Sequence, residues 1–282
     1  MKLACVQLGV EGGAVHENVT TALGAVREAA ADGADLVVLP ELFDVGYFAF
    51  DAYARAAESL AGDRLERFAA VAADADVNVL AGTVVEDIAA SAADGIDTPA
   101  DGTDTPADGT DTPADEGLAN TAVLFDRSGE RRLVYRKRHL FGYGSEETSR
   151  MVPGEREPVT ELEGVRLGVT TCYDLRFPEQ FRRLVEAGVD CVLVPSAWPY
   201  PRVEHWRTLG RARAIENLAY VAAVNGSGTF DDDALCGRTA VYDPWGTTLA
   251  SAGEEPATVT AEIDPGHVAA VREEFPALRD RR

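Results

Sequence analysis

Short apolar runs rich in β-branched residues recur along the chain, and helix-like segments separate several of them. These runs predict strands at residues 2–8, 35–41, 77–85, 121–126, 132–137, 165–172, 190–196, 219–225, 239–244 and 257–264. Segments with a helical pattern lie at residues 17–31, 62–75, 178–187 and 203–218. Strands and helices that alternate at this spacing are typical of an α/β layered fold. The later strands follow one another with only turns between them, so we expect some antiparallel pairing.

One segment does not have the composition of a folded core. Residues 94–114 contain three copies of a seven-residue unit rich in Asp, Gly, Thr and Pro, the last two reading DGTDTPA. Such a segment has too little apolar surface to bury. We therefore expect a disordered acidic insertion at about residues 90–117, between two strands. A cation site formed by its aspartates is the weaker interpretation.

The charge of the chain excludes several classes of partner. Asp and Glu number 48 against 26 Lys and Arg, which gives a formal net charge of −22. Nucleic acids and anionic membranes bind basic surfaces, so we expect neither as a partner. Lys2 and Lys137 are the only lysines, and all other basic residues are arginines. A carboxylate-rich surface with little lysine indicates adaptation to a cytosol of very high salt; ordinary acidic drift is the alternative.

The cysteines favour an intracellular protein. Cys5, Cys172, Cys191 and Cys236 are widely spaced and form no CxxC pair, which fits reduced thiols better than disulfides or a zinc site. No apolar stretch approaches the ~18 residues that a membrane span requires. The first ten residues predict a strand rather than a signal peptide. We therefore expect a soluble, cytoplasmic protein.

Three predicted strands end in a side chain that can take part in chemistry. Glu41 ends "DLVVLPE", Lys137 ends "RLVYRK", and Cys172 ends "VRLGVTTC" before the turn "YDLRFPE". Ligands of open α/β sheets bind at the carboxyl ends of strands, and backbone amides near a helix start favour a thiolate. Each residue alone also has an ordinary interpretation: a solvated carboxylate, a lysine retained by chance, or a structural thiol.

Together, the three side chains match the needs of amide hydrolysis. A cysteine that attacks an amide carbonyl needs a base for its proton, which Glu41 would supply. The oxyanion that forms needs positive charge and hydrogen-bond donors, which Lys137 and the backbone N–H of Tyr173 would supply. A catalytic pair of the cysteine with His16, His139, His205 or His267 is a weaker alternative. The spacing of these four histidines does not suggest a metal site.

These motifs resemble the nitrilase superfamily of carbon–nitrogen hydrolases, which is marked by a Glu–Lys–Cys set. "VVLPELFDVGY" carries Glu41, "YRKRHLF" carries Lys137, and "GVTTCYDLRFPE" carries Cys172; supporting matches cover nearly the whole chain. The resemblance implies a four-layer α-β-β-α sandwich in a single domain over residues 1–282. It also implies a homodimer or higher homo-oligomer, and no metal or organic cofactor.

The resemblance further implies a second glutamate between the lysine and a downstream Pro-Gly. "GSEETSRMVPG" offers Glu146 and Glu147, and the spacing back from Gly154 favours Glu147. Within the superfamily, "CYDLRFPE" and "AWPYPRVEHWRTLGRARAIENLAYV" look most like the ω-amidase or Nit-type branch, which acts on small amides such as 2-oxoglutaramate. The implied reaction is attack by Cys172, loss of ammonia, and hydrolysis of the thioester.

Four further residues are candidates for the substrate pocket. Tyr47, Tyr173 and Trp198 would form its walls, although such aromatic residues more often belong to a core. Arg176 would bind a substrate carboxylate, or would pair with Glu179 instead. A nitrilase or an N-carbamoyl amine hydrolase would use the same Glu–Lys–Cys site. A catalytically idle binding protein of this fold is a different class, and the intact three residues argue against it.

If the acidic surface is a salt adaptation, stability should rise as KCl increases from dilute buffer to molar concentrations, because salt screens the repulsion between carboxylates. Thermal unfolding at constant pH across a KCl series measures this effect. A stability maximum in dilute buffer would contradict the interpretation.

Overall fold

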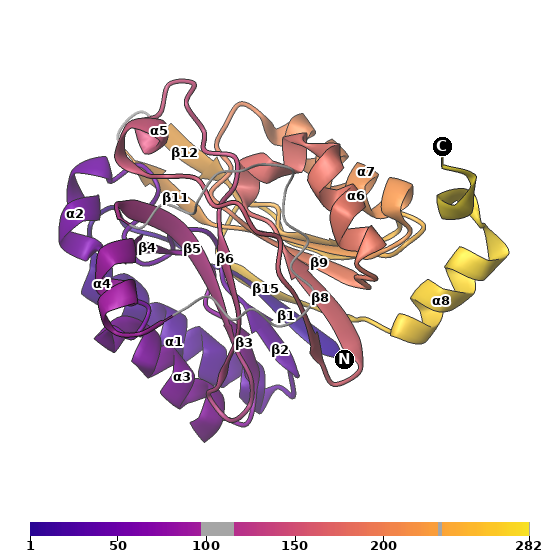
Figure 1. Cartoon of the computed structure of the whole chain (residues 1–282), viewed down its shortest axis with the longest axis horizontal. Helices are drawn as coiled ribbons and strands as arrows, with labels where there is room; N and C mark the ends of the chain where they lie inside the picture. Colours follow the sequence, from indigo (N-terminus) through magenta and orange to yellow (C-terminus); the bar gives the residue numbers. More distant parts are fainter. Residues whose placement is uncertain (97–115, 231–232, 282) are drawn as a thin grey trace.

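Two β-sheets lie face to face at the centre of the computed structural model, which describes residues 1–96, 116–230 and 233–281 (Figure 1). The first sheet has the strand order β15-β1-β2-β3-β5-β4, with β6 paired to β5. Its strands are β1 (Lys2–Gln7), β2 (Leu36–Val38), β3 (Asn78–Leu80), β4 (Val84–Asp87), β5 (Leu118–Phe125), β6 (Arg131–Arg136) and β15 (Ala257–Glu262).

The second sheet has the strand order β14-β13-β10-β9-β8-β7. Its strands are β7 (Val159–Leu162), β8 (Val165–Val169), β9 (Cys191–Ser196), β10 (Tyr220–Asn225), β13 (Ala240–Tyr242) and β14 (Thr248–Ser251). A separate antiparallel pair consists of β11 (Ser227–Phe230) and β12 (Asp233–Cys236). Strands β1–β3 and β8–β10 pair in parallel, whereas β13 and β14 pair antiparallel, which confirms the expected mixture.

Helices cover the outer faces of both sheets (Figure 1). The first sheet carries α1 (Val15–Ala31) and α3 (Asp63–Asp74), and the second carries α6 (Pro178–Glu186) and α7 (Val203–Asn217). The shorter helices are α2 (Tyr53–Ala56), α4 (Ile88–Ala93), α5 (Glu147–Arg150), α8 (Pro265–Glu274), and the 3₁₀ turns η1 (Phe50–Ala52), η2 (Cys172–Arg176) and η3 (Ala277–Asp280). None of the described helices combines the length and apolar character needed to cross a bilayer.

Apolar side chains fill the three spaces between these four layers. Leu36 of the first sheet and Leu193 of the second belong to the core between the sheets. Phe68 of α3 belongs to the core between the helices and the outer face of the first sheet. Phe181 of α6 belongs to the corresponding core on the outer face of the second sheet. Each sheet is therefore buried on both faces, which explains the nearly continuous apolar runs in the sequence. The predicted four-layer α-β-β-α sandwich is confirmed.

The predicted strand ends at Glu41 and Cys172 need correction. Strands β2 and β8 each end three residues earlier, so both side chains lie in the turns that follow. Pro40 has no N–H with which to extend the ladder of β2. Cys172 has a φ of +47°, in the left-handed region that a strand excludes. Lys137, in contrast, directly follows β6.

The repeated acidic segment lies mostly outside the described residues. Of the predicted insertion at about residues 90–117, residues 90–93 are helical as part of α4. The expectation of disorder concerns residues 97–115, which the structure does not describe. The segment connects α4 to β5. Strand β4, which precedes α4, pairs antiparallel with β5.

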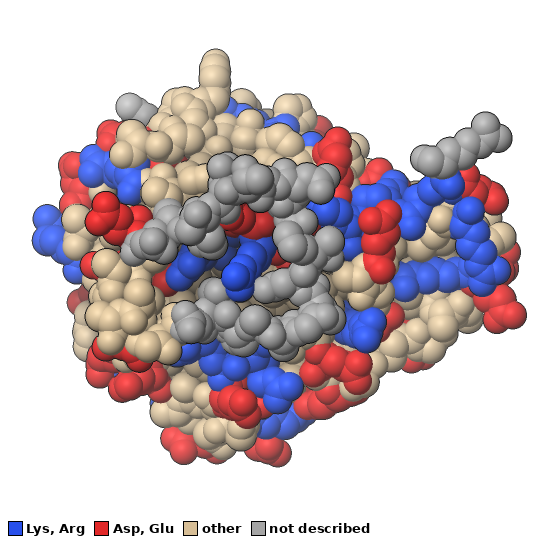
Figure 2. Space-filling model, viewed as in Figure 1, with Lys and Arg blue, Asp and Glu red and all other residues tan. Residues whose placement is uncertain are grey.

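Acidic and basic side chains are interspersed on the face of the molecule seen in Figure 2. Ion pairs account for part of this pattern. The guanidinium of Arg127 lies 2.7 Å from Asp35 Oδ1 and 2.6 Å from Glu163 Oε1, and joins the two sheets at the surface. Half-exposed pairs of this kind each contribute little to stability, about 0–1 kcal/mol.

Gly82 allows the chain between β3 and β4 to pass close to the turn that carries Glu41. Its φ is +46°, and a Cβ at this position would lie 2.0 Å from the carbonyl oxygen of Pro40. The next residue, Thr83, donates its N–H to Pro40 O at 3.3 Å, and its hydroxyl accepts the N–H of Leu42 at 2.8 Å. Both neighbours of Glu41 are therefore fixed by the β3–β4 connection.

Replacement of Gly82 by alanine should lower the free energy of unfolding by about 2–4 kcal/mol, because the new Cβ clashes with backbone in a left-handed conformation. Gly24 in α1 is the matched control, since nothing lies within 4 Å of its Cβ position. Gly24→Ala should stabilise the helix by roughly 0.5–1 kcal/mol. Chemical denaturation of both variants tests this, and equal stabilities would contradict it.

Candidate active site

Three charged side chains from different elements meet where β2 and β6 end. Glu41 follows β2, Lys137 follows β6, and Glu147 opens α5. Lys137 Nζ lies 2.8 Å from Glu41 Oε1 and 2.9 Å from each carboxylate oxygen of Glu147. All three side chains are fully buried. The fold thus brings the predicted glutamate and lysine into direct contact.

Further donors satisfy the Glu41 carboxylate. Asn120, on β5, donates through Nδ2 to Glu41 Oε1 at 2.8 Å and to Glu147 Oε1 at 2.9 Å. The backbone N–H of Ala197, just after β9 of the second sheet, donates to Glu41 Oε2 at 2.8 Å. Buried charges are tolerated only when hydrogen bonds replace their lost hydration. Glu41 is therefore held in one orientation by both sheets.

The structure separates the two candidates for the second glutamate. Glu147 Oε2 accepts the hydroxyl of Tyr47 at 3.2 Å and the backbone N–H of Phe141 at 2.7 Å, in addition to Lys137. Glu146 is exposed and accepts Nε of Arg150 at 2.7 Å, away from the cluster. Glu147 is thus the glutamate that contacts Lys137.

Cys172 opens the turn η2 beside this cluster. The Glu41 carboxylate, the Lys137 ammonium and the backbone of Ala197 all lie close enough to its thiol to affect the pKa of Cys172. The residue is buried, with 7% of its surface exposed. All three predicted residues, the glutamate, the lysine and the cysteine, therefore lie in one contiguous site.

Burial and neighbouring charges set the protonation of this site. Burial, followed by the negative charge of Glu41, raises the pKa of Cys172 well above the ordinary thiol value, although Lys137 opposes the shift. Burial also raises the pKa of Glu41, against the effect of Lys137. Burial disfavours the Lys137 ammonium, but the charges of Glu147 and Glu41 outweigh it and hold its pKa well above normal. The resting site therefore contains a thiol and an ammonium.

A further buried carboxylate, Asp174, joins the cysteine turn to the chain around the lysine. Its Oδ2 accepts the N–H of Thr171 at 2.8 Å and the hydroxyl of Tyr135 at 2.5 Å. Its Oδ1 accepts the backbone N–H of His139 at 3.0 Å and lies 2.7 Å from the Nδ1 of the same residue. Tyr135 and His139 flank Lys137 on either side, so one carboxylate fixes the cysteine turn relative to the lysine.

The histidines do not form a Cys–His pair in the described site. His139 is bonded to Asp174 and stacks on Phe177 with ring centroids 3.7 Å apart. The Nδ1 of His205 lies 3.4 Å from the guanidinium of Arg176. Neither histidine lines the cavity at the cysteine. Among the described residues, no group of three or more His, Cys, Asp and Glu is arranged to hold a metal ion.

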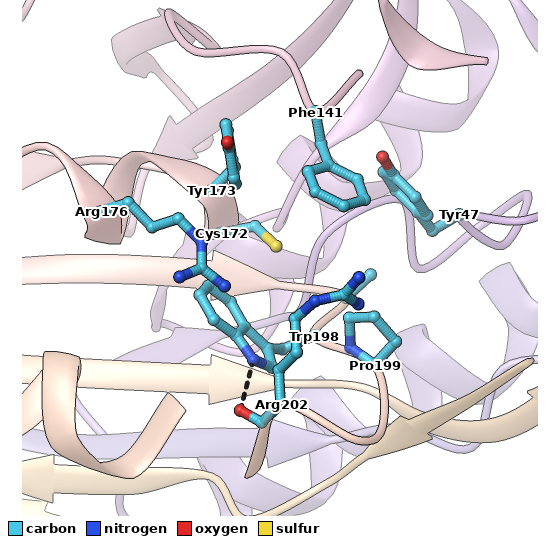
Figure 3. A pocket seen from close by; sticks show the side chains of 9 residues that line it. Tyr47, Phe141, Cys172, Tyr173, Arg176, Trp198, Pro199 and Arg202 are labelled. Atoms are coloured by element: carbon cyan, nitrogen blue, oxygen red, sulfur yellow. Dashed lines mark hydrogen bonds between the residues drawn. The ribbon is translucent and has the colours of Figure 1, made fainter. Parts of the chain in front are cut away.

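A small cavity opens next to the thiol, and the sulfur points into it (Figure 3). All four predicted pocket residues line it, and the full lining is Tyr47, Phe141, Cys172, Tyr173, Arg176, Ala197, Trp198, Pro199 and Arg202. The alternative ion pair of Arg176 with Glu179 is not formed in the structure. The guanidinium instead lies 4.8 Å from the centre of the Trp198 ring.

Several residues of this site were not predicted from the sequence, among them Asn120, Phe141 and Arg202. Asn120 is a buried amide near the start of a predicted strand, and its polarity in an apolar run was an available signal. Phe141 and Arg202 lie in segments without periodicity, "HLFGYG" and "WPYPRVE". Nothing local marks these two as pocket residues, because the fold alone brings them to the cysteine.

Comparison with known proteins agrees with this geometry. The family model described as carbon-nitrogen hydrolase matches residues 2–273. A 2-oxoglutaramate amidase from Paenarthrobacter nicotinovorans is 35% identical over 253 residues, which cover 88% of this chain and 79% of that protein.

Solved structures are similar over the whole fold. Saccharomyces cerevisiae Nit3, a member of branch 10 of the nitrilase superfamily, has a TM-score of 0.83 at 26% identity, covering 100% of this chain and 96% of its own. A mutant amidase from Nesterenkonia sp. AN1, with acrylamide added to its active-site cysteine, has a TM-score of 0.76 at 27% identity, covering 98% of each chain. The predicted resemblance is thus confirmed, and the chain belongs to the carbon–nitrogen hydrolase family of the nitrilase superfamily.

Proposed function

We propose that this enzyme is an ω-amidase-like thiol amidohydrolase, which cleaves small linear amides such as 2-oxoglutaramate and releases ammonia. The observation that carries the proposal is the Cys172 thiol, which faces a small cavity and lies near the buried Glu41 carboxylate. The similarity to a 2-oxoglutaramate amidase supports the choice of substrate class.

In the proposed first half of the reaction, Glu41 acts as the general base. Because the pKa of the Cys172 thiol is raised, a thiolate does not exist beforehand. Glu41 therefore takes the proton as the sulfur attacks the amide carbon. The C–N bond then breaks, and Glu41 returns the proton to the departing nitrogen. Ammonia leaves, and an acyl thioester remains on Cys172.

Lys137 and the backbone N–H of Tyr173 are proposed to stabilise the oxyanion in each tetrahedral intermediate. The two carboxylates that hold Lys137 keep its ammonium charged and fixed in position, and the side chain of Lys137 is fully buried. Fixed donors need no reorganisation when charge develops on the carbonyl oxygen. Loss of one such donor commonly raises the barrier by about 3 kcal/mol.

In the proposed second half, Glu41 activates a water molecule that attacks the thioester. The water loses its proton to Glu41, and its oxygen bonds to the acyl carbon. The C–S bond breaks, the sulfur regains a proton from Glu41, and the carboxylic acid leaves. We propose that Glu147 supports this step by positioning its neighbours, since it accepts hydrogen bonds from Lys137 and from Tyr47 at the edge of the cavity.

The lining of the cavity supports a short substrate with a polar end. Tyr47, Tyr173 and Trp198 are proposed as its walls, and Arg176 as the partner of a substrate carboxylate. A nitrilase or an N-carbamoyl amine hydrolase would need the same Glu41, Lys137 and Cys172. An assay of the enzyme therefore has to include a nitrile and an N-carbamoyl amine as substrates.

We also propose that the protein works as a homodimer or larger homo-oligomer in the cytoplasm. Large apolar side chains are exposed at Ile215 of α7, at Trp245 and at Phe275, and the last two rings lie 6.0 Å apart. Exposed apolar groups of this kind favour association with a second copy. All four cysteines are free and buried, which supports a reducing compartment.

Cys172→Ala should abolish ammonia release because the attacking atom is removed, while thermal unfolding stays close to that of the wild type. The assay is ammonia release in high salt from 2-oxoglutaramate, glutamine, an N-carbamoyl amine, deaminated glutathione and a simple nitrile. Cys236→Ala removes a different buried thiol and should retain activity. Substantial turnover by Cys172→Ala would refute the mechanism, and a preference for the nitrile or carbamoyl substrate would refute the ω-amidase proposal.

Asp174→Asn should lower kcat at least tenfold and stability by about 2–4 kcal/mol, because an amide cannot accept all four donors around it. Turnover should fall more than substrate affinity, since the cysteine turn would shift relative to Lys137. Asp243→Asn is the control: this turn residue uses one oxygen to accept two N–H groups, which asparagine retains. Steady-state kinetics and thermal unfolding measure both variants. An unchanged kcat in Asp174→Asn would show that the network does not position the nucleophile.

A further inference from the structure

The backbone N–H of Ala197 joins the second sheet to the groups around the thiol. It donates to Glu41 Oε2 at 2.8 Å. Burial raises the pKa of Cys172, and the backbone of Ala197 is among the groups that oppose this shift. Ala197 follows Ser196, the last residue of β9, so it lies just beyond the regular ladder between β9 and β10. The position of this N–H therefore depends on what holds the chain after β9 ends.

The side chain of Asn225 continues the pairing beyond that point. Asn225 is the last residue of β10, is fully buried, and lies opposite Ser196 in the ladder. Its Oδ1 accepts the N–H of Trp198 at 2.7 Å, and its Nδ2 donates to Trp198 O at 3.2 Å. A primary amide has the donor and the acceptor of a peptide unit, so it pairs with both backbone groups of Trp198 as a neighbouring strand would. Ala197 is thus held between Ser196 on one side and Trp198 on the other.

The Asn225 amide is itself fixed in one orientation. Its Nδ2 also donates to Gly237 O at 2.8 Å. A reversed amide would place Nδ2 against the N–H of Trp198 and Oδ1 against two carbonyl oxygens. The backbone N–H of Asn225 donates to Thr239 Oγ1 at 3.0 Å, and the N–H of Thr239 donates to Oε1 of Gln7, in β1, at 2.9 Å. Contacts from both sheets therefore set the amide in place.

The sheet itself does not need this amide. The other five residues of β10 read YVAAV and are all buried and apolar, and a β-ladder uses backbone groups alone. A buried amide costs free energy unless hydrogen bonds replace its hydration. Asn225 directs its side-chain hydrogen bonds to Trp198 and Gly237, outside its own strand. It is not among the residues that line the cavity, so it does not contact substrate there.

We propose that Asn225 is a positioning residue, whose side-chain amide fixes the Ala197–Trp198 segment and so keeps the Ala197 N–H aligned on Glu41. This inference rests on the proposed function, because Glu41 is the proposed base. Asn225 touches neither the reacting atoms nor the substrate, and it acts only through the backbone that it holds.

The Trp198 ring has supports of its own. Its Nε1–H donates to Arg202 O at 2.9 Å, and its ring centre lies 5.6 Å from that of Trp206. Loss of the Asn225 amide should therefore loosen the backbone at Ala197 more than the cavity wall. We expect turnover to fall while KM stays nearly constant.

A misaligned Ala197 N–H should also change the pH at which Glu41 ionises. Loss of a hydrogen bond to a carboxylate raises its pKa, and a base with a raised pKa is ionised only at higher pH. The acidic limb of kcat/KM should therefore move to higher pH. The titratable groups that face Glu41 stay unchanged in the test: Lys137 after β6, Glu147 in α5, Cys172 in η2, and Tyr47 and Tyr53 on the chain after β2.

The test measures kcat and KM against pH, at constant ionic strength, for the amide that the wild type hydrolyses fastest. Asn225→Ala should lower kcat about tenfold or more and change KM less than about threefold. The acidic limb of kcat/KM should rise by about half a pH unit or more. Asn225→Thr, which keeps a polar group and a shape that suits a strand, should shift it in the same direction and serves if the alanine variant does not fold.

Asn217→Ala is the matched control. Asn217 is a buried amide at the end of α7, and its Nδ2 donates to Arg213 O at 2.9 Å. This variant should lose stability and keep the kcat and pH profile of the wild type. If the Asn225 variants also lose only stability, the positioning role is overturned.

Alkylation of Cys172 by iodoacetamide separates this inference from the proposed reaction, because it needs no amide hydrolysis. Its rate is followed by peptide mass at Cys172 over the same pH range, in the wild type and in Asn225→Ala. A rate profile that moves to higher pH in the variant supports the positioning role, even if no amide in the panel releases ammonia. Superimposable profiles refute the role, even if the enzyme hydrolyses amides.

Discussion

The buried contact between the Lys137 ammonium and two carboxylates is the constraint on which the rest of the site depends. Three charges without solvent are stable only when each has its partners, and removal of one from such a group typically costs about 3–5 kcal/mol. Glu41, Asn120 and Glu147 supply those partners from three different elements. Ala197 adds a donor from the second sheet. The hydrogen bonds that hold Glu41 and Lys137 in place therefore also connect the two sheets.

Much of this arrangement could be predicted from the sequence, because its signals are local. Glu41, Lys137 and Cys172 each follow an apolar run, and the alternation of strands and helices places such positions together. The end of β8 was not predictable, since the left-handed conformation of Cys172 is a property of the folded backbone. Pro40 marks the end of β2 in the sequence itself, and the predicted strand wrongly ran past it. The choice of Glu147 over Glu146 depends on which side chain faces Lys137 once α5 has formed. Arg202 could be identified as a pocket residue only from the folded structure, where it lines the cavity.

The cavity combines two opposite charge environments within a strongly acidic protein. A chain with a net charge of −22 repels anions at long range, and high salt would shorten that repulsion to a few ångströms. At the cavity itself, Arg176 and Arg202 contribute two positive charges to the lining. Capture of an anionic substrate would then depend on short-range contacts rather than on steering across the surface.

The scarcity of lysine has a practical consequence for handling the protein. Of the two lysines, Lys137 is fully buried, while Lys2 lies at the amino end of β1 with its Nζ bonded to the carbonyl of Asp32. The parallel strands β1 and β2 begin at that end, whereas Glu41 follows the opposite end of β2. Amine-directed coupling to a support or a dye would thus attach the folded chain through Lys2 or the terminal amine. Every attached molecule would present the cavity beside Cys172 away from the linkage.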